Sequence, residues 1–125
     1  MANALKMTLE KDGTIVADPC VLAKSFGARV LGLMGKRGLP EREGLLLEPC
    51  NSIHTFFMRF AIDVAYLGRV PRDEGAKEKR YRVMAIRRAM RPWKVDFPVF
   101  GAAAVLEMAQ GGATALAEGD ILCLS

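Results

Sequence analysis

The sequence predicts a mainly β, single-domain protein, with a sandwich-like or barrel-like antiparallel sheet and one principal α-helix in the N-terminal third. Its 125 residues suit one domain with one core, and a hydrophobic fraction of 51% is typical of a compact globular protein. Many short apolar runs, bounded by Gly, Pro, Asn or charged residues, predict strands, whereas one stretch has helical spacing. Short strands with a single helix favour a sandwich or barrel over alternating βαβ units. We therefore treat residues 1–125 as one domain.

The first predicted element is a β-hairpin. Leu5–Leu9 alternates apolar and polar side chains with the period of a strand, and so does the shorter run Thr14–Val16. The segment between them, Lys11–Gly13, ends in the Asp-Gly pair that hairpin turns favour. We therefore expect these two runs to pair with each other.

A long amphipathic helix is predicted next, from Cys20 to about Met34. Asp18 can cap a helix, and Pro19 suits the first helical position. Two glycines shortly after Met34 are expected to end the helix. The apolar residues that recur at spacings of three and four, and so share one helical face, are Val21, Leu22, Phe26, Val30, Leu33 and Met34.

The rest of the chain is predicted as strands and loops. Gly68–Lys79 is a charged surface loop, and residues 91–98, which include two prolines, form an irregular stretch. The run Ile53–Met58 has an aromatic side chain on each face, so we expect a central strand covered on both sides. The predicted strands are Gly44–Leu47, Ile53–Met58, Ile62–Leu67, Tyr81–Ile86, Val105–Met108 and Ile121–Leu124.

His54 and Asp63 are the two residues most suggestive of a site, because titratable groups inside apolar runs are costly unless they are paired or used. A structural Asp63 would bond backbone N–H groups or one of the arginines Arg29, Arg37 and Arg59. Otherwise it is a catalytic or ligand-binding carboxylate. His54 is either a histidine satisfied by one hydrogen bond or a general acid or base.

Other catalytic and cofactor motifs do not emerge from the sequence. One histidine, with Cys50 four residues before it, does not supply the ligands of a zinc site, so no metal is predicted. There is no Gly-x-Ser-x-Gly elbow and no P-loop, and no cofactor is predicted. Cys20, Cys50 and Cys123 are widely spaced and are expected to be buried thiols in a reducing compartment, with one disulfide as the alternative.

The charge is unevenly distributed along the chain. The segment Arg69–Lys94 holds ten basic and three acidic residues, a net charge of +7, so the remaining residues carry −3 of the total of +4. This segment is either solvated surface or a contact for an acidic protein or another anionic partner, and it holds no specific nucleic-acid motif. No signal peptide or apolar run near the ~18 residues of a membrane span is visible, which predicts a soluble, cytoplasmic protein.

Several motifs in this order resemble the DUF192 family: Arg29-x-x-Gly32-Leu33-Met34-x-x-Arg37, Gly44-Leu45-Leu46, the run Ile53–Val64, Val105–Gly111 and Gly119-Asp120. The resemblance covers the chain from about residue 5 onward. It implies a small, mainly β domain with a helix in its N-terminal third, and it supplies no activity. Members of the family are often exported. The positions that match the motifs, and are therefore the candidate ligand-binding residues, are Arg29, Met34, Arg37, His54, Met58, Asp63 and Glu107.

Two classes of function follow from these residues. The first is a non-enzymatic binding or accessory domain, with a small pocket or partner surface around His54 and Asp63. The alternative is a small hydrolase-like or isomerase-like enzyme, in which His54 is the acid or base and Asp63 orients it. An enzyme would need both residues and an arginine to converge on one accessible pocket.

Overall fold

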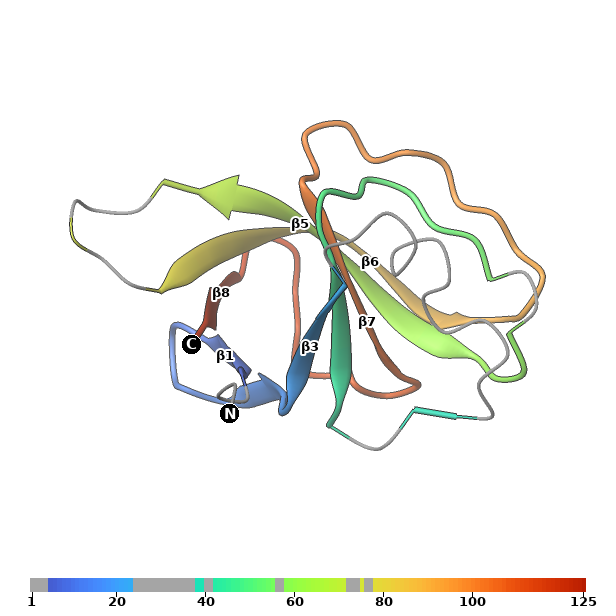
Figure 1. The fold of residues 1–125 in the computed structure, drawn as a ribbon, viewed down its shortest axis with the longest axis horizontal. Helices are drawn as coiled ribbons and strands as arrows, with labels where there is room; N and C mark the ends of the chain where they lie inside the picture. Colours follow the sequence, from blue (N-terminus) through green and yellow to red (C-terminus); the bar gives the residue numbers. More distant parts are fainter. Residues whose placement is uncertain (1–4, 24–37, 40–41, 56–57, 72–74, 76–77) are drawn as a thin grey trace.

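The computed structural model describes residues 5–23, 38–39, 42–55, 58–71, 75 and 78–125. Over these residues eight strands form a single sheet (Figure 1), and the predicted mainly β fold is confirmed. The order of the strands in the sheet is β2-β1-β8-β6-β5-β7-β4-β3. The strands are β1 (Met7–Leu9), β2 (Ile15–Ala17), β3 (Cys20–Ala23), β4 (Gly44–Leu47), β5 (Ile62–Val70), β6 (Lys79–Met90), β7 (Ala104–Ala109) and β8 (Ile121–Leu124).

The sheet curls strongly, because its two edge strands are neighbours in the chain. β2 and β3 lie at opposite edges of the sheet, yet only Asp18 and Pro19 separate them in sequence. The backbone N–H of Cys20 also donates to the carbonyl of Leu5 at 2.6 Å, which ties the beginning of β3 to the segment that leads into β1. The two edges therefore meet, and the sheet has a barrel-like inner face and an outer face (Figure 1).

Alternation along the strands divides the buried residues into two cores. The inner core, inside the curl, takes residues from every strand, and Met7, Leu67, Tyr81, Leu106 and Leu122 are among its members. The outer core includes Leu45, Leu47, Val64, Tyr66 and Val105. Residues 48–55 and 91–103 lie side by side over it, joined by backbone hydrogen bonds, and can be followed in Figure 1 as adjacent green and orange segments.

Most of the local predictions agree with these strands. β1 and β2 form the expected antiparallel hairpin, and Gly13 in its turn has the positive φ of 76° that glycine adopts without strain. The predicted strands that begin at Gly44 and Ile121 have the observed bounds. The others that pair within the sheet differ from prediction by a few residues at their ends.

The predicted helix from Cys20 to Met34 is not supported. Its first residues, Cys20–Ala23, form strand β3, which pairs in parallel with β4. The partner strand lies about twenty residues away, and such distant pairing overrides local helical spacing. Residues 24–37, which include the rest of the predicted helix, lie outside the described residues. The described residues contain no helix long and apolar enough to cross a membrane.

The predicted central strand Ile53–Met58 is also wrong over its described residues. It contributes one isolated bridge, between His54 and Val95, and is otherwise irregular. Its partner segment contains Pro92 and Pro98, which lack the N–H groups that a longer ladder needs. Residues 53–55 therefore pair with a loop rather than with a strand.

Candidate functional site

Four of the sequence-predicted site residues lie in described parts of the chain: His54, Met58, Asp63 and Glu107. Met58 is buried in the outer core, and His54 is exposed. The other three, Arg29, Met34 and Arg37, lie outside the described residues.

Asp63 is a buried carboxylate held by backbone donors. It lies on β5 with its side chain toward the inner face and is 2% exposed. Its Oδ1 accepts the N–H of Ala89 at 2.8 Å. Its Oδ2 accepts the N–H groups of Gly111 and Ala113, at 3.1 and 3.0 Å. The carboxylate thus joins the end of β6 to the turn after β7, which is a structural task.

Glu107 and Asp63 do not form a carboxylate pair. Asp63 is paired in register with Met108, and Glu107 is paired with Val64 on β5 and with Leu45 on β4. Successive residues of a strand point to opposite faces, so Asp63 faces the inner side of the sheet and Glu107 the outer side.

His54 lies where the outer segments are fastened together. It forms the isolated bridge with Val95, and the residues around it are joined by four backbone hydrogen bonds. These bonds run from Thr55 N to Lys94 O (2.8 Å), Trp93 N to Thr55 O (2.8 Å), Asp96 N to Ile53 O (3.1 Å) and Val99 N to Asn51 O (2.9 Å).

The side chain of Thr55 strengthens this attachment. Thr55 is fully buried, and its Oγ1 donates to the carbonyl of Arg91 at 2.6 Å. The same oxygen accepts the N–H of Lys94 at 2.8 Å. One hydroxyl therefore satisfies two backbone groups of a loop that has little regular structure of its own.

Asp96 anchors the middle of the same loop to the sheet. Its Oδ2 accepts the Tyr66 hydroxyl at 2.8 Å and lies 2.9 Å from the Arg87 Nε. The Arg87 guanidinium also lies over the Tyr66 ring, 5.6 Å from its centroid. Burial and the neighbouring Asp96 carboxylate raise the pKa of Tyr66 above its ordinary value, so the phenol remains a donor.

Residues 91–100, which we name the aromatic loop, nevertheless expose large apolar side chains. Trp93 is 59% exposed, Val95 66%, Phe97 84% and Phe100 91%. Asp96 turns inward to Tyr66 and Arg87, and its neighbours Val95 and Phe97 turn out. The sequence interpretation missed this surface. The sequence pattern that could have indicated it is a run of large apolar residues among prolines, with neither helical nor strand periodicity.

Positive charge surrounds these side chains. Residues 87–100 contain four basic residues and one acid, a net charge of +3. Arg91 and Lys94 are exposed. Arg88 reaches the carbonyls of Ala113 and Leu116, at 3.2 and 2.8 Å. Over the described part of the chain, no group of three or more His, Cys, Asp or Glu side chains is arranged to hold a metal ion.

Comparisons with known proteins give a family and a fold. Residues 7–122 match the model of the DUF192 family, which is described as "Uncharacterized ACR". A protein of unknown function from Novosphingobium aromaticivorans DSM 12444 is 22% identical, with a TM-score of 0.72 over 95% of this chain and 82% of that one. A "putative transcription regulator" from Sinorhizobium meliloti 1021 is 17% identical, with a TM-score of 0.70 over 98% of this chain and 95% of that one. At these identities the two structures show a shared fold alone. No curated protein matches the chain.

Proposed function

Because the chain belongs to the DUF192 family, whose description assigns no activity, we propose a function from the geometry of its own residues. The protein is a non-enzymatic binding domain. Its partner surface is the aromatic loop together with His54, and its partner is an acidic protein segment that also carries apolar side chains.

The observation that carries this proposal is that the aromatic loop is both fastened and exposed. Four backbone hydrogen bonds, the Thr55 hydroxyl and the Asp96 carboxylate hold the loop against the molecule. Large apolar side chains on a mobile tail would need ordering before they could bind, at an entropic cost. Here the backbone is already held, so Trp93, Phe97 and Phe100 are presented at little further cost.

Charge determines the kind of partner. Arg91 and Lys94 are exposed on the loop, and the region around it carries a net positive charge. Protein interfaces combine an apolar centre with a polar rim, and Trp and Arg are enriched among the residues that dominate their affinity. An acidic segment with one or two Leu or Phe side chains complements both features of this surface.

The enzyme alternative receives less support from the geometry. It needs Asp63 to orient His54, whereas both carboxylate oxygens of Asp63 accept backbone N–H groups. Asp63 also faces the inner side of the sheet, and His54 lies in the segment over the outer face. Hydrogen bonds of this kind suit Asp63 to stabilising the strands rather than to orienting His54.

Selection from a library of short displayed peptides tests the proposal. We expect the selected peptides to be rich in Asp and Glu with interspersed Leu or Phe, and to bind more weakly as salt is raised. By fluorescence anisotropy, the double variant Phe97→Ser/Phe100→Ser should weaken binding about tenfold or more. The control Ile15→Ser removes another exposed apolar side chain, on β2, and should leave the affinity unchanged.

Other outcomes would contradict the proposal. Selected peptides without acidic residues would contradict the acidic partner. An affinity that the double variant does not change would contradict the aromatic loop as the binding surface. Phe97-dependent and Phe100-dependent binding to vesicles of anionic lipid, without peptide binding, would replace the protein partner with a membrane surface. Loop-dependent self-association in light scattering would replace it with a second copy of the chain.

A further inference from the structure

A second cluster of polar residues lies at the end of the inner face, where β5 ends and β6 begins. Alternate residues of β5 face inward, from Asp63 through Ala65 and Leu67 to Arg69. Asp63 is bound at one end of this row, and Arg69 stands at the other. Lys79 and Tyr81 of β6 and Glu48, which follows β4, surround Arg69 there. We name Glu48, Arg69, Lys79 and Tyr81 the mouth cluster.

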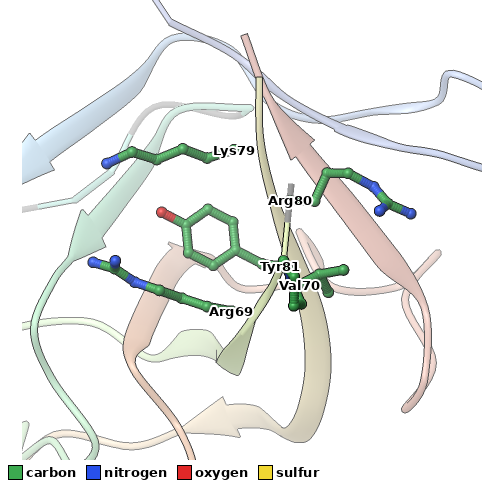
Figure 2. A pocket seen from close by; sticks show the side chains of 6 residues that line it. Arg69, Val70, Lys79, Arg80 and Tyr81 are labelled. Carbon is green, nitrogen blue, oxygen red and sulfur yellow. The ribbon is translucent and has the colours of Figure 1, made fainter. Parts of the chain in front are cut away.

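Glu48 is the centre of the mouth cluster. Only 8% exposed, its carboxylate accepts the Tyr81 hydroxyl at 3.1 and 3.2 Å and the Arg69 Nε at 3.0 Å. The Lys79 Nζ lies 3.8 Å from its Oε1. Burial and the Glu48 charge raise the pKa of Tyr81, which therefore stays protonated and donates. Figure 2 shows the ends of Arg69, Lys79 and Tyr81 pointing to the same side.

The cluster opens into a hollow of about 290 Å³. It is lined by Arg69, Val70, Pro71, Lys79, Arg80 and Tyr81 (Figure 2). A shallower hollow of about 460 Å³, lined in part by Cys50 and Ala103, also borders Arg69. Arg69 therefore lines two recesses at the mouth of the curled sheet, a common place for small-molecule sites in barrels.

The charges of the cluster do not balance. Two cations, Arg69 and Lys79, face one carboxylate, that of Glu48, which leaves a net charge of +1. Arg69 contacts Glu48 through Nε, and its side chain is 64% exposed. This Nε contact leaves the edge of the guanidinium formed by the two Nη atoms for a planar anion, which can meet it with two parallel hydrogen bonds. The Lys79 side chain is 41% exposed, and its ammonium lies beyond hydrogen-bond distance of Glu48.

We infer that the mouth cluster binds a small organic monocarboxylate. Its carboxylate group is held by the Arg69 Nη atoms and the Lys79 ammonium, and its short apolar body lies against Pro71 and the Tyr81 ring, which also line the hollow. A single negative charge neutralises the net charge of the cluster. A phosphate dianion would exceed it and would face the Glu48 carboxylate at close range, which disfavours phosphate. Pro71 and the Tyr81 ring, beside the two cations, favour an organic anion over an inorganic one.

Titration with sodium hexanoate, followed by amide and side-chain NMR, tests the inference. We expect saturable shifts at Arg69 and Lys79, none with the uncharged hexanol, and weaker binding of inorganic phosphate than of hexanoate. Arg69→Gln and Lys79→Gln should each weaken hexanoate binding about tenfold. The control Arg82→Gln removes the same charge from a neighbouring exposed position of β6, and should leave the affinity almost unchanged.

Arg69→Lys guards against loss of fold, because it keeps an ion partner for Glu48. It should retain the dispersed spectrum of the native protein and still bind hexanoate more weakly, since an ammonium lacks the planar fork. The inference would be overturned if Arg69→Lys bound hexanoate with full affinity, or if Arg82→Gln weakened binding as much as Arg69→Gln does. It would also be overturned if phosphate bound as tightly as hexanoate, or if hexanoate showed no saturable binding. Phe97→Ser/Phe100→Ser should leave hexanoate binding intact. The proposed anion site and the proposed partner surface can therefore be confirmed or rejected independently of each other.

Discussion

Buried carboxylates organise this molecule at the scale of single residues. Asp63 and Glu48 both lie below a tenth of full exposure, and each joins segments that are distant in sequence. Asp63 uses three backbone N–H groups, whereas Glu48 uses a phenol and a guanidinium. Backbone donors cannot move away when a ligand approaches, but the side chains around Glu48 can. The first carboxylate is therefore suited to holding the fold, and the second lies at a place suited to binding.

Replacing Asp63 by Ala should destabilise the protein strongly. The change removes the hydrogen bonds that the N–H groups of Ala89, Gly111 and Ala113 donate to a charged carboxylate, and a hydrogen bond to a charged group contributes about 1.5–3 kcal/mol. We expect the free energy of unfolding to fall by about 3 kcal/mol or more, measured by urea denaturation. Asp12→Ala is the control, because Asp12 accepts one N–H at an exposed turn. This change should lower the free energy of unfolding much less. A stable Asp63→Ala protein would show that these bonds contribute little.

At the scale of elements, a strand could be predicted from the sequence when its local pattern is clear, and not when it depends on pairing with a distant segment. Gly44–Leu47 and Ile121–Leu124 were predictable because their apolar runs are short and sharply bounded. Cys20–Ala23 was not, because its parallel partner β4 follows a long intervening segment. His54 was singled out by its chemistry, but its setting depends on hydrogen bonds with residues 93–96, which no local pattern encodes. The mouth cluster could not be predicted from a local pattern, because its members come from β5, β6 and the residue after β4.

Thr55→Val should loosen the aromatic loop while the sheet stays intact. Valine has the shape of threonine but lacks the hydroxyl that bonds the backbone of Arg91 and Lys94. We expect the amides of Trp93, Lys94 and Asp96 to exchange hydrogen about tenfold faster, as the loss of about 1–2 kcal/mol of local stability implies. Amides of β5 should be unaffected.

Thr114→Val is the matched control for this change. The Thr114 hydroxyl bonds the carbonyl of Gly111 at an exposed turn, outside the aromatic loop. Its removal should leave loop exchange unchanged. Equal protection of the loop amides in wild type and Thr55→Val would mean that the backbone bonds alone fasten the loop.

For the molecule as a whole, the sheet separates two cores that share β5. Its residues alternate between them, with Leu67 in the inner core and Tyr66 in the outer core. The partner surface lies over the outer core, and the mouth cluster lies at the end of the inner core. Both cores depend on the same strands, so we expect them to unfold together.

The two tyrosines of the chain, Tyr66 and Tyr81, report one core each. The pKa of both is raised above the ordinary value of 10.0, mainly by burial. The folded protein therefore retains protons that the unfolded chain loses above about pH 10, and its stability must fall as pH rises from there.

An alkaline titration measures this coupling. We expect tyrosinate absorbance to stay flat through pH 10 and then to rise in one step, together with the loss of β-sheet circular dichroism. Tyr66→Phe and Tyr81→Phe should each remove half of that step without dividing it. Two separate steps, or a smooth titration centred near pH 10, would contradict a single cooperative unit.

The position of β8 has a consequence for the order of events during synthesis. β1 and β2 are made first, yet β8 lies between β1 and β6 and contributes Leu122 and Leu124 to the inner core. A ribosome must therefore complete Ile121–Leu124 before the sheet can be continuous between β1 and β6. Until then the nascent chain presents the unpaired edges of β1 and β6 to chaperones and to other chains. The time between making the first strand and the last is the interval in which this protein is most exposed to misassembly.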